Sequence, residues 1–275
     1  MRQLYVIGDP VAHSLSPLIQ RAMIRQTEAA YRYDVRTVRP DELADFVAWA
    51  RDGGCAGCNV TMPLKEAIVP LLDEVDGAAA ACGAVNTVCI RAGRAVGHNT
   101  DGDGLLDSLA GQGFDPRGAR VLLLGAGGAA TAVCHALTQA GAARIAVCNR
   151  SVLRAETLAA RYPGCAVAGG LGDLARYAAD SELVVNATSL GMAGCAGFDD
   201  LSFLWAAPGS AMVYDLVYHP RQTTLLAAAD GLGLRTVGGI DLLIRQAVRA
   251  FALFTGVEPD TEALYAALRE PLGLE

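Results

Sequence analysis

A glycine-rich stretch near the middle of the chain restricts the fold more than any other feature of the sequence. Residues 120–130 read Arg-Val-Leu-Leu-Leu-Gly-Ala-Gly-Gly-Ala-Ala. An apolar run that predicts a β-strand ends at Gly125 and leads directly into a helix-forming run over residues 129–140. In such a strand–turn–helix unit, Gly125 allows a tight turn, Gly127 lets the backbone approach a pyrophosphate, and the small Ala130 lets the helix pack on the strand.

This turn is a candidate dinucleotide-binding site, although an ordinary glycine-rich turn has the same pattern. The candidate cofactor-binding residues of the turn are Gly125, Ala126, Gly127, Gly128 and Ala129.

The end of the next predicted strand indicates which dinucleotide the turn binds. Asn149, Arg150 and Ser151 follow this strand, and Arg154 lies one helical turn further on. An acidic residue in this region typically binds the ribose hydroxyls of NAD, whereas arginine suits the 2′-phosphate of NADP. Ser151 also fits as the N-cap of a helix over residues 152–161, and both roles are compatible. Charge complementarity therefore favours NADP over NAD.

Composition excludes several classes of partner. The 275 residues suffice for two domains, and 52% of them are hydrophobic, so the chain can bury a large core. A formal charge of −7 argues against nucleic acid or an anionic membrane as the main partner. The sequence contains no apolar run of membrane-spanning length and begins with a strand-like segment rather than a signal peptide, so we expect a cytoplasmic protein. Whether it is a monomer or a homodimer stays open.

The eight cysteines are expected to be reduced and mostly buried thiols. Cys55 and Cys58 have the C-x-x-C spacing of redox and zinc sites, but no second pair accompanies them and the histidines lack metal-ligand spacing. We therefore interpret the pair as coincidental and expect no metal.

The first hundred residues alternate between predicted strands and helices, which indicates an α/β layer of its own. The predicted strands are 3–8, 31–37 and 56–60, followed by a hairpin of 85–90 with 95–97. The predicted helices are 17–28, 41–51, 63–72 and a short one near 76–81.

The rest of the chain continues the strand–helix rhythm, which predicts a doubly wound parallel sheet. Its predicted strands are 121–124, 144–148, 165–168, 183–186, 211–215 and 235–237. Its predicted helices are 102–110, 129–140, 152–161 and 222–231, followed by two helical patterns after Ile240. We therefore expect an α/β fold with two domains: residues 1–101 and 239–275 form one, and residues 102–238 form a Rossmann-type domain.

Several polar clusters lie outside the glycine-rich turn. Ser14 and Ser16 precede Pro17 at the entry to the first helix, where two hydroxyls make a fair carboxylate site. Ser16 as the N-cap and Pro17 as the first helical residue would also explain part of this pattern without a ligand.

A second cluster, Asn59-Val-Thr61-Met-Pro-Leu-Lys65, leaves a strand and enters a helix. The positive charge of Lys65 in the first helical turn opposes the helix dipole, which is unfavourable unless it has a partner or a purpose. Asn86 ends an apolar stretch of small residues, and Asp101 directly precedes a predicted helix, where it could equally serve as an N-cap.

The order of these motifs resembles the shikimate dehydrogenase family over essentially the whole chain. The motifs are Ser-x-Ser-Pro from Ser14, Asn-Val-Thr-x-Pro-x-Lys from Asn59, Ala-Val-Asn-Thr from Ala84, Asn-Thr-Asp-x-x-Gly from Asn99 and Gly-Ala-Gly-Gly-Ala from Gly125. The resemblance continues through Asn149-Arg-Ser, Asn186-Ala-Thr188-Ser189, Asp215-Leu-Val-Tyr218 and Gln246.

The resemblance implies an NADP-dependent oxidoreductase that interconverts 3-dehydroshikimate and shikimate, a small-molecule substrate of chorismate and aromatic amino-acid biosynthesis. It implies that an N-terminal α/β domain, completed by the C-terminal helices, holds the substrate and that the Rossmann domain holds NADP. It also implies that the glycine-rich turn faces the catalytic residues across the cleft between the two domains.

The resemblance also implies which residues form the site, position by position in this sequence. Lys65 and Asp101 are implied as the catalytic pair. The implied substrate-binding residues are Ser14, Ser16, Asn59, Thr61, Asn86, Tyr218 and Gln246. The implied NADP-binding residues beyond the glycine-rich turn are Asn149, Arg150, Ser151, Arg154, Thr188, Ser189 and Gly239. A lysine beside a carboxylate can deliver the proton that a ketone needs as hydride reaches its carbon, although either residue could be the donor.

Two alternatives share these motifs. A quinate/shikimate dehydrogenase that prefers NAD has nearly all of them, but Arg150 argues against it because NAD favours an acid near the ribose. A non-catalytic module that binds a shikimate-like ligand is disfavoured by the presence of both Lys65 and Asp101.

Overall fold

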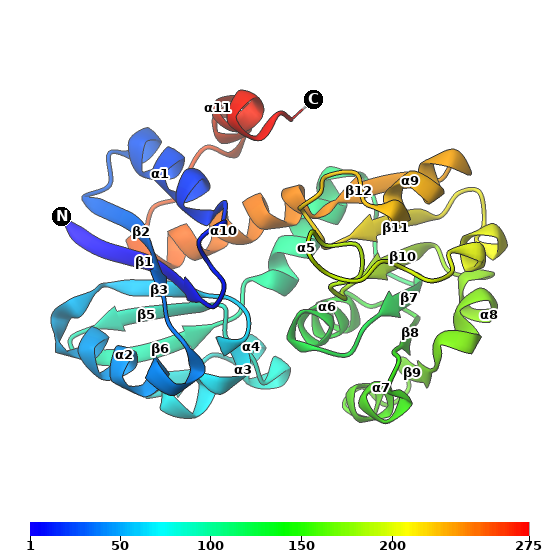
Figure 1. Cartoon of the computed structure of the whole chain (residues 1–275), viewed down its shortest axis with the longest axis horizontal. Helices are drawn as coiled ribbons and strands as arrows, with labels where there is room; N and C mark the ends of the chain where they lie inside the picture. The colour runs from blue at the N-terminus through cyan, green and yellow to red at the C-terminus, as the bar shows by residue number, and fades with distance from the viewer. Residues whose placement is uncertain (275) are drawn as a thin grey trace. The chain divides into compact units, whose positions relative to one another are not determined.

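The chain folds into two compact units, each built on one six-stranded sheet. The computed structural model describes residues 1–274. Unit 1 comprises Met1–Thr100 and the segment that starts at Ile244, and unit 2 comprises Asp101–Leu243. Both units combine a sheet with helices, which confirms the predicted α/β fold (Figure 1).

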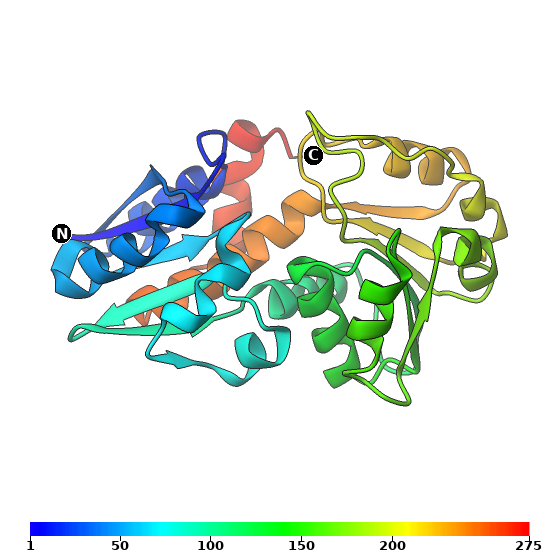
Figure 2. The same cartoon turned by 60° about the horizontal axis from the view of Figure 1, so that its bottom comes forward.

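The sheet of unit 1 is mixed and has the order β2-β1-β3-β5-β6-β4. Its strands are β1 (Arg2–Gly8), β2 (Tyr31–Thr37), β3 (Gly57–Val60), β4 (Glu74–Val75), β5 (Thr87–Arg91) and β6 (Arg94–His98). β1 runs parallel to β2 and β3, whereas β5 is antiparallel to both β3 and β6. The hairpin β5–β6 is therefore adjacent to β3, and Figure 2 shows this sheet from a second direction.

Strand alternation gives this sheet two apolar faces. Leu4 and Val6 of β1 pack with Ala250 and Phe254 of α10 (Gly239–Thr255). On the opposite face, Ile7 packs with the apolar side of α2 (Leu43–Trp49). The remaining helices of unit 1 are α1 (Ser16–Thr27), α3 (Leu64–Ala67), α4 (Gly77–Cys82) and α11 (Thr261–Leu272).

Two predicted helices of unit 1 are shorter and more broken than expected. The segment 41–51 consists of a 3₁₀ turn, Pro40–Glu42, then α2, and then a π-helical segment, Ala50–Gly54, in which Gly53 has φ 94°. The segment 63–72 consists of α3 and a separate 3₁₀ turn, Val69–Leu71. Pro70 has no N–H to donate, so the α-helical hydrogen-bond pattern stops before it.

The sheet of unit 2 is fully parallel and has the order β12-β11-β10-β7-β8-β9. Its strands are β7 (Arg120–Leu124), β8 (Arg144–Cys148), β9 (Ala166–Gly169), β10 (Leu183–Asn186), β11 (Met212–Asp215) and β12 (Arg235–Gly238). This is the strand order of a Rossmann sheet, in which β7 and β10 flank the point where the order reverses. The predicted doubly wound sheet is confirmed.

Helices cover both faces of this sheet. Leu122 and Leu124 of β7 pack with α8 (Leu174–Ala178) and α9 (Thr224–Gly231). The alternate residues Val121 and Leu123 face α5 (Asp101–Gly111), α6 (Gly128–Gln139) and α7 (Val152–Ala159). β7 is therefore apolar on both faces from Val121 to Leu124, as a strand buried on both faces must be.

Candidate functional site

The glycine-rich turn lies at the carboxyl end of β7, beside the loop that follows β10. Gly125 has φ 112°, a conformation that favours glycine, and a Cβ atom there would lie 3.0 Å from the Ala187 carbonyl oxygen and 3.1 Å from the Thr188 methyl group. Only glycine therefore allows the two loops to approach this closely. In a Rossmann sheet, ligands bind in the crevice at this point.

The helix after the turn presents unpaired backbone donors. α6 has Gly127 as its N-cap and begins at Gly128, and Ala130 is fully buried against the sheet, as its small side chain predicts. The first N–H groups of a helix have no partner within the helix, so they and the positive end of the helix dipole suit an anion. Ala126, Gly127, Gly128 and Ala129 remain partly accessible.

The predicted 2′-phosphate site follows β8. Arg150, Ser151 and Arg154 are all exposed, and neither arginine forms an ion pair within the described residues. Asn149 donates from Nδ2 to the Ser151 carbonyl oxygen over 3.0 Å, which closes the turn. Ser151 occupies the N-cap position of α7, but its side chain makes no capping hydrogen bond. The turn thus carries two unpaired guanidinium groups and an uncommitted hydroxyl.

A buried carboxylate holds together the loops after β10 and β11. Asp215 accepts hydrogen bonds from Asn186 Nδ2 at 2.8 Å, Val217 N at 3.0 Å and Thr223 Oγ1 at 2.6 Å. Burial raises the pKa of Asp215, and these three donors oppose the rise. Asn186 in turn accepts from the Thr188 hydroxyl at 2.6 Å. The positions of Thr188 and of the 215–218 segment therefore depend on one network.

The other predicted residues of unit 2 lie close to these loops. Ser189 is exposed, and Tyr218 is half-buried, which raises the pKa of its phenol. Gly239 starts α10, and a Cβ there would lie 2.2 Å from the Leu216 carbonyl oxygen. Only glycine fits this close approach between the start of α10 and the 215–218 segment.

Three predicted substrate-binding residues of unit 1 belong to one polar network. Asn59 Nδ2 donates to the Asn86 carbonyl oxygen over 3.2 Å, and Asn86 Nδ2 donates to Thr100 Oγ1 over 3.0 Å. Thr100 Oγ1 also donates to the Gln246 carbonyl oxygen over 3.1 Å. The structure thus brings together residues from β3, from the position just before β5, from the segment between β6 and α5, and from α10.

The start of α3 lies beside the same segment. The Lys65 carbonyl oxygen accepts from Val85 N over 2.8 Å, immediately before Asn86. Thr61 N donates to the Ile7 carbonyl oxygen over 2.9 Å, so Thr61 continues from the end of β3 beside β1. Both side chains are half-buried.

The predicted cap at the start of α1 is wrong in detail. Leu15, not Ser16, is the N-cap, and Ser16 is already helical because α1 begins there with Pro17 in its first turn. Ser14 Oγ accepts from Ser16 N over 3.2 Å, which explains Ser14 as a turn residue. One turn along α1, Gln20 donates to the Ala247 carbonyl oxygen over 3.2 Å, so this end of α1 packs beside α10 near Gln246.

Asp101 is also placed differently from the prediction. α5 begins at Asp101 itself, so this residue lies in the first helical turn rather than before it. It is buried, and its carboxylate near the helix N-terminus is favoured by the helix dipole.

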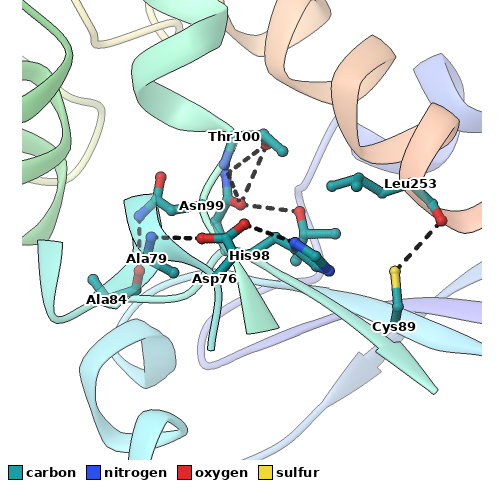
Figure 3. Close-up of polar contacts among 10 residues, drawn as sticks. Asp76, Ala79, Ala84, Cys89, His98, Asn99, Thr100 and Leu253 are labelled. Atoms are coloured by element: carbon teal, nitrogen blue, oxygen red, sulfur yellow. Dashed lines mark hydrogen bonds and ion pairs between the residues drawn. The ribbon is translucent and has the colours of Figure 1, made fainter. Parts of the chain in front are cut away.

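A histidine–aspartate pair next to the network has no counterpart in the sequence analysis (Figure 3). His98 Nδ1 lies 2.7 Å from Asp76 Oδ2, and Asp76 Oδ1 accepts from Ala79 N to cap α4. The hydrogen bond with Asp76 is the main cause that raises the pKa of His98 to about 9, and the Cys89 side chain contributes. The pKa of Asp76 is lowered, because the hydrogen bonds from His98 and Ala79 outweigh the effect of burial. The His98 carbonyl oxygen accepts from Asn86 N over 3.0 Å, so the pair lies directly beside the network.

Three members of the network were also missed by the sequence analysis. Tyr33, Thr87 and Thr100 are buried polar residues that link the predicted amides. A tyrosine in a strand and threonines next to asparagine are ordinary features of a sequence, so only their burial and partners reveal them.

Neither a metal centre nor a membrane span is found in the described part of the chain. No three histidine, cysteine, aspartate or glutamate side chains of residues 1–274 gather in a way that could hold a metal ion. Cys55 and Cys58 are free and buried, and burial raises the pKa of both thiols. None of the helices described is both long and apolar enough to cross a membrane.

Comparison with known families matches three successive parts of the chain. Residues 6–88 match the shikimate dehydrogenase substrate-binding domain, residues 108–192 match the shikimate/quinate 5-dehydrogenase family, and residues 239–269 match the shikimate 5′-dehydrogenase C-terminal domain. The three matches together fall in both units.

Individual relatives extend this similarity to nearly the whole chain. A shikimate dehydrogenase (NADP(+)) of Geobacter metallireducens is 45% identical over 268 residues, which cover 94% of this chain and 92% of the relative. The structure of shikimate 5-dehydrogenase from Thermus thermophilus in complex with NADP(H) and shikimate is 35% identical and superposes with a TM-score of 0.89 over 98% of this chain and 99% of the other. Quinate dehydrogenase from Corynebacterium glutamicum in complex with NAD is 34% identical, with a TM-score of 0.88 over 98% and 99% of the two chains.

The pair of His98 and Asp76 predicts a pH-dependent contribution to stability. The folded-state pKa of His98, about 9, exceeds its ordinary value of 6.5. The pair therefore stabilises the folded protein fully below pH 6.5, as long as Asp76 stays ionised. This stabilisation is lost as the pH rises through 9. We expect His98→Gln to destabilise the protein by about 1 kcal/mol at pH 6, since solvent screens a partly exposed pair. Thermal unfolding at pH 6 and pH 10 measures the difference.

The gap between wild type and His98→Gln should close at pH 10. His13→Gln is the matched control, because His13 is exposed and forms no ion pair within the described residues. A gap that stays constant with pH would contradict the charged pair.

Proposed function

Because the chain belongs to the shikimate dehydrogenase family, we propose that it catalyses the reversible NADPH-dependent reduction of 3-dehydroshikimate to shikimate, a step of chorismate and aromatic amino-acid biosynthesis. The observation that carries the proposal is that one chain contains two candidate sites, one suited to the cofactor and one suited to the substrate. Unit 2 has a glycine turn and two unpaired arginines suited to NADP, and unit 1 has a polar network suited to a small polyol acid.

The residues of unit 2 fit NADP in shape and in charge. We assign the pyrophosphate to the turn Gly125–Ala129, where the glycine geometry and the first N–H groups of α6 suit an anion. We assign the 2′-phosphate to Arg150, Arg154 and Ser151, with Asn149 closing that turn. Thr188, Ser189 and Gly239 complete the proposed site at the carboxyl ends of β10 and β12. When bound, NADPH supplies the hydride.

The substrate assignments use polar residues from several elements. We assign the substrate carboxylate to Ser14, Ser16, Thr61 and Tyr218. Asn59, Asn86 and Gln246 are assigned to the ring hydroxyls, because hydrogen bonds already fix at least Asn59 and Asn86 in orientation. Preorganised polar groups favour a ligand whose hydroxyls match them and reject one that leaves them unpaired.

Lys65 and Asp101 are assigned as the catalytic residues, with Lys65 as the proton donor. Lys65 is the only lysine in the chain, and all other basic side chains apart from the histidines are arginines. Lysine can release a proton at accessible pH, whereas arginine keeps its own. A lysine at this one position therefore fits a role in proton transfer to the oxygen of the reduced ketone. Asp101 is assigned to orient the reacting hydroxyl and the ammonium group.

The cellular location and assembly state are also part of the proposal. Eight free cysteines support a reducing compartment such as the cytoplasm. We propose a monomer or a homodimer with a small-molecule substrate.

Steady-state rates with each of four pairs test the function: shikimate or quinate, each with NADP⁺ or NAD⁺. We expect the highest kcat/KM for shikimate with NADP⁺. Absence of turnover with every pair would refute an enzyme. Quinate with NAD⁺ at equal or higher efficiency would instead identify an NAD-dependent quinate/shikimate dehydrogenase.

Arg150→Ala tests the 2′-phosphate assignment. We expect the KM for NADP⁺ to rise about tenfold or more, the size of one charged hydrogen bond, with little change in the KM for NAD⁺. Arg161→Ala, which removes a guanidinium further along the same segment, is the control. Equal losses for both cofactors would rule out a role specific to the 2′-phosphate.

Substitution of Lys65 tests the proton donor. Lys65→Ala should lower kcat by about 10²-fold or more with a modest change in KM, because the help is given mainly in the transition state. Lys65→Arg keeps the positive charge but holds its proton, so it should also lose most of kcat. If Lys65→Arg retains kcat, Lys65 acts through charge alone, and if Lys65→Ala raises only KM, Lys65 only binds substrate.

A further inference from the structure

A buried chain of hydrogen bonds runs through unit 1 behind the proposed substrate-binding amides. The Tyr33 hydroxyl in β2 donates to Asn59 Oδ1 in β3 over 2.7 Å. Asn59 Nδ2 donates to Thr87 Oγ1 over 3.0 Å, and Thr87 Oγ1 donates to Asn86 Oδ1 over 2.9 Å. All four side chains are buried, so each hydrogen bond is shielded from water. These hydrogen bonds all run in one direction, with each donor on the Tyr33 side and each acceptor on the Asn86 side.

The amide of Asn59 has only one orientation that satisfies its neighbours. Its Nδ2 has two hydrogens, which bond to the Asn86 carbonyl oxygen at 3.2 Å and to Thr87 Oγ1 at 3.0 Å. Turning the amide over would place Oδ1 against the Asn86 carbonyl oxygen, and two acceptors cannot pair. Both donors of Asn59 are therefore used inside the protein.

What remains on Asn59 is an acceptor. Oδ1 has two lone pairs, and Tyr33 occupies one of them. Asn59 keeps 8% of its surface exposed, so the other lone pair is the polar group that it can offer to a ligand.

The packing of Tyr33 does not require its hydroxyl group. Its ring lies in the apolar cluster with Leu4, Val6 and Phe254, where phenylalanine would fit equally well. Within residues 1–274, Asn59 is the one hydrogen-bond partner of the phenol. Burial raises the pKa of Tyr33 well above its usual value, so the phenol stays protonated and remains a donor.

We propose that Tyr33 is a positioning residue. Its hydroxyl holds the Asn59 amide in the orientation in which Asn59 Oδ1 accepts a hydrogen bond from a substrate hydroxyl, and Asn59 donates none to the substrate. This inference rests on the proposed function, which assigns Asn59 to a ring hydroxyl. The inference also predicts which substrate analogues the site rejects. An analogue that carries only an acceptor at that hydroxyl, such as a fluorine or a methoxy group, leaves Asn59 Oδ1 facing another acceptor and should bind weakly.

Tyr33→Phe, compared with Tyr31→Phe, tests the proposal. Tyr31 lies in the same strand, is similarly buried and donates to the Phe254 carbonyl oxygen over 2.9 Å, so its substitution also removes a buried hydrogen bond but has no link to Asn59. We expect Tyr33→Phe to raise the KM for shikimate about fivefold to tenfold, with kcat within about twofold and the KM for NADP⁺ unchanged, because one neutral hydrogen bond has this effect. Tyr31→Phe should lower the melting temperature similarly and leave every KM unchanged.

A double-mutant cycle then shows whether Tyr33 acts through Asn59. In an Asn59→Ala background, Tyr33→Phe should change the KM for shikimate by less than about twofold, since the group it positions is gone. Thr87→Val, which is isosteric and removes the acceptor on the other side of the amide, should raise the same KM in the wild-type background. Full additivity of Tyr33→Phe and Asn59→Ala would overturn the positioning role.

The outcomes separate the two proposals. If the wild type does not turn over shikimate, the proposed function fails. If it does, but Tyr33→Phe matches Tyr31→Phe in the KM for shikimate, the inference about Tyr33 fails by itself. The fluorinated or methoxy analogue gives a second check, because the preference for shikimate over the analogue should shrink in Tyr33→Phe, where the Asn59 amide is less constrained.

Discussion

The pairing of β7 with β10 places Leu124 opposite Asn186, and the proposed cofactor site depends on this register. Each strand continues into a loop at the same edge of the sheet, so close that a Cβ atom at Gly125 would lie 3.0 Å from the Ala187 carbonyl oxygen. A side chain at Gly125 would crowd Ala187 and Thr188, and it would require a φ of 112° that residues other than glycine rarely adopt. The glycine is therefore a condition for the close approach of the two loops as well as for the turn itself.

The requirement that buried polar groups find partners organises the rest of both sites. In unit 2, Asp215 is fully buried and satisfied by three donors, from the end of β10, from the loop after β11 and from the N-cap of α9. In unit 1, the antiparallel pairing of β3 with β5 sets Asn59 opposite Thr87, and the amide of Asn59 uses both its donors there. Such networks are costly if one member is lost, because they leave a buried group unpaired. They are also rigid, and a rigid amide presents a defined hydrogen-bonding pattern to a ligand.

The local errors of the sequence analysis have simple physical causes. The segment 63–72 has helical periodicity, but Pro70 removes a donor and divides it into α3 and a 3₁₀ turn. The segment 41–51 begins as a 3₁₀ turn and ends in a π-helical segment, where Gly53 reverses the backbone. Ser16 looked like an N-cap because serine before proline commonly is one, yet the helix starts one residue earlier and Ser14 makes the hydrogen bond. Helix ends depend on a single residue, so they are the least predictable part of a helix.

The amino-acid sequence alone was sufficient for the α/β class, the parallel sheet of unit 2, the glycine turn and the family resemblance, since these follow from patterns among consecutive residues and from the order of short motifs. It also marked Asn59, Asn86 and Gln246 individually. It did not show that Tyr33, Thr87 and Thr100 join these residues into one network, or that His98 pairs with Asp76. Tyr33 and Asn59 are 26 residues apart, and Asn59 and Thr87 are 28 apart. A hydrogen bond between such residues exists only once the strands have paired, so the direction in which Asn59 offers its acceptor is a property of the folded sheet.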